Sequence, residues 1–192
     1  MARWEPGARE RIVLAAVDLF TEQGYDETTV AQIAERAGVT RSTFFRYFPD
    51  KREVLAAGQE TLSGLLAEGI TEAPPGSSAL DAVASGLRRV SGAMGPMNRE
   101  LAPRLEAAVA ANAELQERQA AKIVGLAAAM TSALLARGLP EPTAQLAAEL
   151  GVLAFKRGFA EWSATDADRE ADLASYTVTA LGELRRAAAE LG

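Results

Sequence analysis

The sequence has 192 residues, a net charge of −6, and 41 alanines against an aromatic content of only 6%. Because alanine has the highest intrinsic helix propensity, this composition predicts a mainly helical protein. Cysteine and histidine are both absent, which excludes disulfides, zinc fingers, cysteine nucleophiles and histidine-based acid–base catalysis. The amino-terminal stretch is charged and the apolar runs are shorter than a membrane span, so we expect a soluble, cytoplasmic protein without a membrane segment.

Three short helices are predicted at the start of the chain. The first covers residues 8–23 and carries apolar residues at helical spacing. The second opens with a capping box at Thr29 and ends at Gly38. The third covers residues 41–48 and is capped by Thr40. A short helix, a turn with glycine and a second short helix form the arrangement called helix–turn–helix.

A long fourth helix is predicted from Lys51 to Ile70, because a second capping box precedes an apolar stripe at helical spacing. Residues 71–78 read as a linker that contains two prolines. The helices predicted beyond it cover residues 79–94, 98–110, 112–137, 143–164 and 168–191. The predicted fold is therefore all-α with about nine helices. A three-helix N-terminal domain (residues 1–52) is joined by the long helix to a C-terminal helical bundle (residues 53–192).

Charge is distributed unevenly along the chain. Residues 1–52 carry eight basic and eight acidic groups, so the acidic surplus falls in the remainder. Between Arg36 and Arg52 there are five basic residues and one acidic residue, Asp50. A basic segment on an acidic protein is typical of a polyanion-binding site, and a solvated helix face is the alternative.

The residues of the third helix favour the polyanion-binding reading. Phe44 and Phe48, four residues apart, would face the interior. The residues left on the outer side are polar, cationic or aromatic: Arg41, Ser42, Thr43, Phe45 and Arg46. Such a surface suits insertion into the major groove of DNA, where bases are read near the start of the helix.

Three runs in this region keep a dense and specific spacing. They are Ala16-x-x-Leu19-Phe20-x-x-x-Gly24-Tyr25, Thr28-Thr29-Val30-x-x-Ile33-Ala34, and Ala37 to Phe48 followed by Lys51. Over residues 8–55 the sequence resembles the DNA-binding domain of TetR-family transcriptional regulators. Beyond Leu55 the resemblance is one of layout: a long linking helix, then a helical domain that binds a ligand and dimerises.

This resemblance implies a function and a set of partners. We expect a homodimeric repressor that binds a palindromic operator in double-stranded DNA and is released by a small-molecule effector. The implied DNA-binding residues are Thr29, Arg41, Ser42, Thr43, Phe45, Arg46, Tyr47 and Lys51. Thr29 and Lys51 would bind phosphates, and residues 41–43 would lie at the bases. Phe45 stands where the family often has tyrosine, so an apolar contact with a sugar or a thymine methyl group would replace a phosphate hydrogen bond.

The C-terminal half contains two candidate surfaces. Two glycines inside one predicted helix cost roughly 1 kcal/mol each unless another helix packs closely. The candidate dimer-interface residues are Gly151, Gly158, Tyr176, Ala180 and Leu184. The candidate ligand-pocket residues, which suit an apolar or amphipathic effector, are Met94, Met97, Met130, Phe155, Phe159 and Trp162. Packing within one subunit is the alternative for the first set, and ordinary core for the second.

Two other classes of function are weighed against a regulator. An enzyme would have to use carboxylates such as Glu106, Glu114 or Glu149, and the sequence contains no catalytic motif. An interaction protein with a degenerate helix–turn–helix would have lost its basic residues. The acidic run from Asp166 to Asp172 lacks the glycine of a calcium loop and fits helix capping. We therefore expect no enzymatic activity, no cofactor and no metal site.

Overall fold

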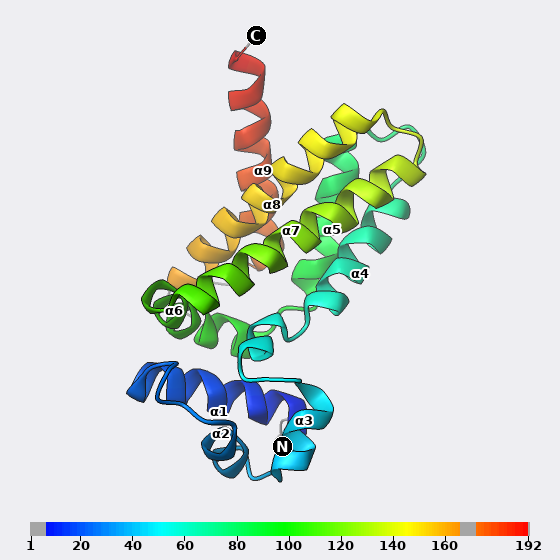
Figure 1. The fold of residues 1–192 in the computed structure, drawn as a ribbon. Helices are drawn as coiled ribbons and strands as arrows, with labels where there is room; N and C mark the ends of the chain where they lie inside the picture. Colours follow the sequence, from blue (N-terminus) through cyan, green and yellow to red (C-terminus); the bar gives the residue numbers. More distant parts are fainter. Residues whose placement is uncertain (1–6, 166–171, 192) are drawn as a thin grey trace, which may run out of the picture. The chain divides into compact units, whose positions relative to one another are not determined.

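The computed structural model describes residues 7–165 and 172–191, and these residues form an all-α fold (Figure 1). The helices are α1 (Ala8–Gln23), α2 (Val30–Arg36), α3 (Arg41–Tyr47), α4 (Gln59–Thr71), α5 (Ala79–Gly92), α6 (Pro96–Ala111), α7 (Ala113–Ala136), α8 (Glu141–Ala164) and α9 (Leu173–Glu190). A short 3-10 helix, η1 (Arg52–Ala56), lies between α3 and α4. The all-α prediction is confirmed.

The predicted caps explain where several helices begin. At α2 the Thr29 hydroxyl accepts a hydrogen bond from the Gln32 backbone, and the Gln32 side chain accepts one from the Thr29 backbone. At α9 the Asp172 carboxylate accepts a hydrogen bond from the Ser175 backbone at 2.9 Å. Both pairs satisfy amide groups that the first helical turn leaves without partners. Residues 166–171, where the last helix was predicted to start, lie outside the described residues.

The prediction of one continuous helix from Lys51 to Ile70 is wrong. Residues 52–56 form η1, and Gly58 then adopts a left-handed conformation with a φ of +81° before α4 begins. A left-handed residue cannot belong to a right-handed helix, so the chain turns at this point. Glycine occupies this position without the steric penalty that a Cβ would bring.

The chain divides into two compact units. Unit 1 consists of Met1–Ala57 and Leu101–Ala121, and unit 2 consists of Gly58–Glu100 and Lys122–Gly192. The chain therefore passes from one unit to the other at residues 57–58 and also within α6 and within α7.

Unit 1 has its own hydrophobic core. Its buried residues are Ile12, Ala15, Ala16, Leu19, Phe20, Tyr25, Ile33, Ala34, Ala37, Phe44, Phe48, Val54, Leu55, Ala108 and Leu115. Most of them come from α1, α2, α3 and η1, which pack together. Ala108 and Leu115 come from the end of α6 and the start of α7, and Leu115 is fully buried. Burial of these apolar side chains is the main force that fixes the orientation of the three N-terminal helices.

Unit 2 is built from close helix pairs. At Gly69 of α4, a Cβ atom would lie 2.7 Å from the Cα of Gly86 on α5. At Gly158 of α8, a Cβ would lie 2.5 Å from the backbone nitrogen of Thr177 on α9. Such distances leave no room for a side chain, so these glycines let the helices approach more closely than other residues would allow.

Helix α7 is the one described helix whose length and apolar composition would let it cross a membrane. This is a weak indication, because the core helices of water-soluble proteins share both properties. In α7, 28% of the most apolar window is buried inside the protein, and Val124 on its outer side is 67% exposed.

Candidate nucleic-acid interface

Helices α2 and α3 are joined by a tight turn. Gly38 has a φ of +64°, and the Val39 backbone nitrogen donates a hydrogen bond to the Ala34 carbonyl at 2.9 Å. A left-handed glycine just after the last turn is a common way to end a helix. The Thr40 hydroxyl then accepts a hydrogen bond from the Thr43 backbone at 3.1 Å and starts α3. The predicted helix–turn–helix is therefore present, with both helices defined by local contacts.

Two phenylalanines fix the inner face of α3. Phe44 is fully buried and Phe48 is 3% exposed, with their ring centroids 5.9 Å apart. The Arg9 guanidinium lies over the outer side of the Phe48 ring, 5.7 Å from its centroid. With this face held in the core of unit 1, the opposite face of α3 must point to solvent.

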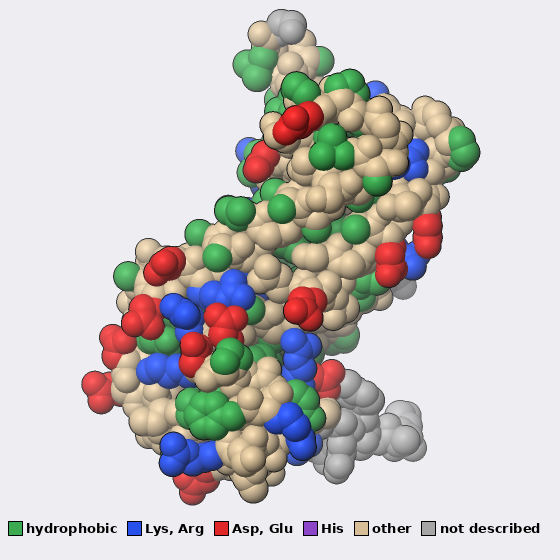
Figure 2. Space-filling model, turned by 45° about the vertical axis from the view of Figure 1, so that its right-hand side comes forward, with side chains coloured by type: hydrophobic (Ala, Val, Ile, Leu, Met, Phe, Trp, Pro, Cys, Tyr) green, Lys and Arg blue, Asp and Glu red, His purple; other side chains and the backbone are tan. Residues whose placement is uncertain are grey.

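The outward residues of α3 are the ones that the sequence predicted to contact DNA. Arg41, Ser42, Phe45, Arg46 and Tyr47 are exposed, and Thr43 is half-buried beside Thr40. The Arg46 guanidinium stacks over the Tyr47 ring at 5.1 Å. Figure 2 shows a hydrophobic patch with basic side chains around it, and acidic side chains among them, on the part of the surface that unit 1 forms.

The other basic residues of this segment are engaged within the chain. Arg36 forms an ion pair with Glu22 at 2.6 Å. Arg52 lies 3.9 Å from the carboxylates of both Asp50 and Glu53. Two arginines of the segment, Arg41 and Arg46, remain on the outward face of α3. Neither of them has an acidic partner among the described residues.

Lys51, which was predicted as a phosphate ligand at a helix N-terminus, lies at the start of η1 and has contacts within the chain. Its ammonium nitrogen donates to the backbone carbonyls of Tyr25 at 2.6 Å and Thr28 at 2.8 Å, with the Asp26 carbonyl at 3.4 Å. It also lies 4.1 Å from the centroid of the Tyr25 ring. An ammonium has three donors, and these contacts occupy them. Thr29, the other predicted phosphate ligand, is exposed at the start of α2.

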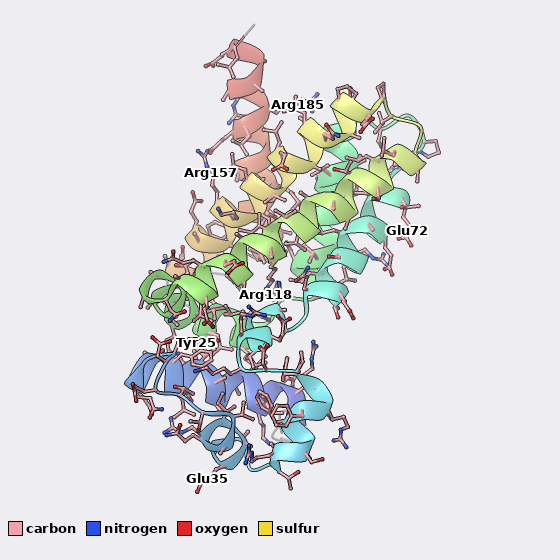
Figure 3. The ribbon with its side chains drawn as sticks, viewed as in Figure 1. Tyr25, Glu35, Glu72, Arg118, Arg157 and Arg185 are labelled. Carbon is pink, nitrogen blue, oxygen red and sulfur yellow. The ribbon has the colours of Figure 1, made fainter. Side chains whose placement is uncertain are left out.

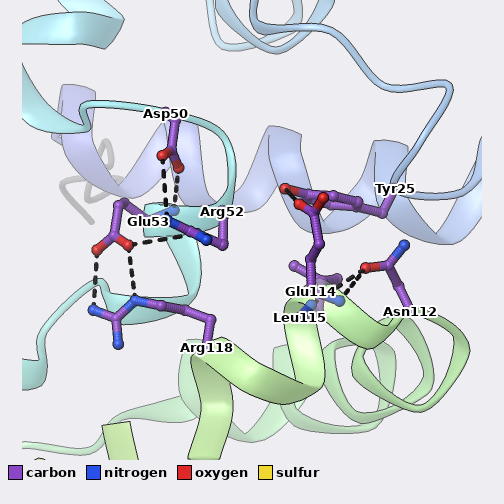
Figure 4. Close-up of polar contacts among 8 residues, drawn as sticks. All are labelled: Tyr25, Asp50, Arg52, Glu53, Asn112, Glu114, Leu115 and Arg118. Carbon is purple, nitrogen blue, oxygen red and sulfur yellow. Dashed lines mark hydrogen bonds and ion pairs between the residues drawn. The ribbon is translucent and has the colours of Figure 1, made fainter. Parts of the chain in front are cut away.

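A polar contact set in unit 1, which we call the clasp, was not predicted (Figures 3 and 4). The Arg118 guanidinium binds both oxygens of the Glu53 carboxylate, at 2.9 and 3.0 Å. The Tyr25 hydroxyl donates to the Glu114 carboxylate at 2.9 Å. Burial raises the pKa of the Tyr25 hydroxyl, and the hydrogen bond to Glu114 raises it further, so this group stays a donor.

The clasp joins the N-terminal helices to residues 101–121. Two further contacts belong to it: Arg104 with Asp18, and Asn112 with Asp26. Its partners lie between 65 and 89 positions apart in the sequence. Helical periodicity and capping motifs extend over a few residues only, so they contain no signal for such pairs.

Three of the six candidate pocket residues form an aromatic ladder on α8. Phe155 stacks on Phe159 at 5.8 Å, and Phe159 packs against Trp162 at 5.7 Å. Trp162 is 6% exposed and the Arg99 guanidinium lies 5.4 Å from its ring. Met130 is fully buried, whereas Met94 and Met97 are half-buried. Their assignment to a ligand pocket stays a prediction.

Four of the five candidate dimer-interface residues are buried within unit 2. A Cβ at Gly151 would meet the side chains of Val83 at 2.7 Å and Met130 at 3.1 Å. Gly158 packs on Thr177, as described above. Ala180 and Leu184 are buried, and Tyr176 is half-buried. The close helix packing inferred from the glycines is present within the chain, and their role in a dimer stays a prediction.

Sequence comparison with known proteins matches mainly the N-terminal part of the chain. Residues 12–57 match the profile of the bacterial regulatory proteins of the tetR family. TcmR of Streptomyces glaucescens, an HTH-type transcriptional regulator, is 36% identical over 84 residues, which cover 44% of this chain. That match spans only 37% of the length of TcmR.

Solved structures resemble the chain over nearly its whole length. A protein from Syntrophomonas wolfei described as a TetR-family transcriptional regulator has a TM-score of 0.62 at 19% identity, with 95% of each chain covered. Thermus thermophilus FadR, a TetR-family repressor solved with lauroyl-CoA, has a TM-score of 0.51 at 27% identity. Its match covers 92% of this chain and 93% of FadR.

The fold and the outward face of α3 define a protein with an N-terminal helix–turn–helix domain. More narrowly, the N-terminal domain is similar to the DNA-binding domains of the tetR family of bacterial regulatory proteins over residues 12–57. The remaining helices have the all-α fold of solved regulators of that family.

Proposed function

We propose that this chain is a ligand-responsive DNA-binding transcriptional regulator that acts as a homodimeric repressor in the cytoplasm. Residues 1–52 would supply the DNA-binding domain, and residues 53–192 would supply the ligand-binding and dimerisation domain. The observation that carries the proposal is the outward face of α3. Arg41 and Arg46 are exposed and have no acidic partner within residues 7–165 and 172–191, and two buried phenylalanines hold their helix in place. An exposed basic surface of this kind is better suited to binding a polyanion than to catalysing the reaction of a small molecule.

Operator selection from a random library of DNA duplexes tests this proposal. Wild-type protein should enrich a two-fold symmetric sequence, because one short helix reads only a few base pairs and two copies are needed for affinity. Arg41→Ala should weaken binding to the selected operator by roughly 1–3 kcal/mol and relax its base preference. Arg88→Ala is the matched control, since Arg88 is an exposed arginine on α5. Failure of the wild-type protein to enrich any sequence would contradict the proposal.

We propose that the effector is apolar or amphipathic. The methionines and the aromatic ladder of α8 in unit 2 support an adaptable apolar site. FadR of Thermus thermophilus, whose structure contains lauroyl-CoA, supports an amphipathic effector in particular. Operator-binding titrations with lauroyl-CoA as the probe, and with coenzyme A as the control, should show weaker DNA binding with the acylated compound alone. Equal DNA affinity under both conditions would remove acyl thioesters as effectors.

We propose that the dimer forms through the outward faces of α8 and α9. The inward faces of both helices are already used within unit 2. On α8, Leu146 is 62% exposed and Leu153 is 39% exposed, one above the other at a spacing of seven residues. On α9 the outward side carries small residues such as Ser175 and Gly182, which would allow a second helix to approach closely. Apolar side chains exposed in this pattern are typical of a helix that packs against a partner.

A further inference from the structure

The outward face of α3 contains an apolar side chain in an otherwise polar and basic surface. Phe45 is 50% exposed, although it lies between Arg41 and Arg46 on a helix that is proposed to enter the major groove. A half-exposed phenylalanine gains little stability for the fold, since half of its apolar surface stays in water. This residue therefore has a surface available for a partner.

The ring of Phe45 is held in a defined position. Its centroid lies 5.5 Å from that of Phe44, with the two rings at 87° in an edge-to-face arrangement. Phe44 is fully buried and packs in turn on Phe48. A ring that is already fixed loses little conformational entropy when it makes a contact, so even a small apolar partner can add to affinity.

The chemistry of the ring limits what it can recognise. Phenylalanine has no hydrogen-bond donor or acceptor for a phosphate or a polar base edge. The major groove offers one apolar group, the C5-methyl of thymine. Resting on the proposed function, we infer that Phe45 contacts a thymine methyl group in each half of the operator and makes thymine the preferred base there.

Tyr47 provides an internal comparison. Two residues along a helix are about 200° apart, so Phe45 and Tyr47 lie on opposite flanks of the outward face. Tyr47 is 38% exposed, carries a hydroxyl, and has the Arg46 guanidinium stacked on its ring. These groups suit the phosphate backbone, which carries no sequence information. The two flanks thus differ in chemistry, and the apolar flank is the one that can discriminate a base.

Single replacement of each operator thymine by deoxyuridine tests the inference, because it removes only the methyl group. With the operator selected by wild-type protein, one replacement in one half should weaken binding about three- to five-fold, as expected for one buried methyl. In Phe45→Ala the thymine and uracil operators should bind equally. In Tyr47→Phe overall affinity should fall while the preference for thymine persists.

Two results would overturn the inference. One is a selected operator in which no uracil replacement affects wild-type binding, which would place Phe45 against a sugar and leave the proposed function intact. The other is a uracil effect of the same size in Phe45→Ala and in wild type. A random library from which the wild-type protein enriches nothing would instead contradict the proposed function itself. Phe45→Leu, which keeps an apolar side chain, should retain part of the methyl effect if Phe45→Ala folds poorly.

Discussion

Three backbone carbonyl groups in the turn between α1 and α2 point at one ammonium group. Lys51 donates to two of them at 2.6 and 2.8 Å and lies over the Tyr25 ring. These carbonyls belong to a turn where regular helical hydrogen bonding has ended, so they need donors from elsewhere. At this position the lysine supplies hydrogen-bond donors to the carbonyls of the turn and links η1 to the segment before α2, and both contacts contribute to the stability of unit 1.

Replacement of Lys51 by methionine should therefore destabilise the domain. Methionine keeps the apolar stem and removes the charged donor, and hydrogen bonds to charged groups contribute about 1.5–3 kcal/mol. We expect the free energy of unfolding to fall by about 2 kcal/mol, measured by urea denaturation monitored by circular dichroism. The salt dependence of operator binding should stay unchanged.

Arg46→Met is the matched control for this prediction. Arg46 is exposed, so its replacement should leave stability unchanged and lower the slope of log affinity against log salt by about one. The reverse outcome, with the salt slope lowered by Lys51→Met and its stability unaltered, would show that Lys51 binds a phosphate.

At the scale of helices, three glycines near α4 differ in backbone conformation and in the space around them. Gly58 adopts a left-handed conformation in the turn between η1 and α4. Gly69 makes the close crossing with α5 at Gly86. Gly64 has neither property, since a Cβ added there would meet no atom within 4 Å. Gly69 therefore allows a close helix crossing, while Gly58 interrupts the helix that was predicted to run from Lys51 to Ile70.

Alanine substitutions at Gly64 and Gly69 should have opposite effects on stability. Gly64→Ala should raise the free energy of unfolding by roughly 0.5–1 kcal/mol, because it restricts the unfolded chain without a clash. Gly69→Ala should lower it, since its Cβ would lie 2.7 Å from backbone. Thermal denaturation of the two variants side by side provides the measurement. A lower midpoint for Gly64→Ala would show that the open space at this glycine is needed.

The clasp leads to a second prediction about helices. The Glu53–Arg118 pair is bidentate, and its side chains are 25% and 17% exposed. The Glu22–Arg36 pair has the same chemistry with exposures of 54% and 40%. Water screens the exposed pair more strongly, so its coupling energy should be smaller.

Double-mutant cycles with glutamine at each position measure both coupling energies. We expect about 1 kcal/mol or more for Glu53–Arg118 and under about 0.5 kcal/mol for Glu22–Arg36. Contacts of Arg118 with other groups cancel in the cycle. Equal coupling energies in the two cycles would mean that the partial burial of the clasp does not strengthen it.

For the whole molecule, the proposed function depends on the pairing of two chains. The operator proposal requires two copies of α3 separated by about 34–36 Å or a multiple of this distance, as successive turns of DNA demand. The exposed leucines of α8 are the proposed contact. Helix α7 also exposes an apolar residue, Val124, so the two helices can be compared directly.

Leu153→Glu should convert the dimer to monomers, because a charged carboxylate would be buried without a partner in the interface. Sedimentation velocity measures the change, and operator affinity should fall with it. Val124→Glu is the matched control, with an exposed apolar residue replaced on α7. If the dimer persists in Leu153→Glu and dissociates in Val124→Glu, the interface lies on α7.

Local sequence patterns were enough to predict most of the helices and the outward face of α3. Caps such as Thr29 and Thr40, and the pair Phe44 and Phe48, act over three or four residues, and their effects follow from local geometry. The side chains of α3 that face outward could be predicted for the same reason.

The partners of residues that are distant in the sequence became evident from the folded chain. Lys51 lies on carbonyls more than 20 positions away, Arg118 pairs with Glu53 from 65 positions away, and Gly158 packs on α9 of its own chain. The break at Gly58 also became evident only in the structure, because glycine is compatible with both a helix interior and a left-handed turn. These outcomes depend on how apolar faces from separate segments are buried together, and local sequence patterns do not contain that information.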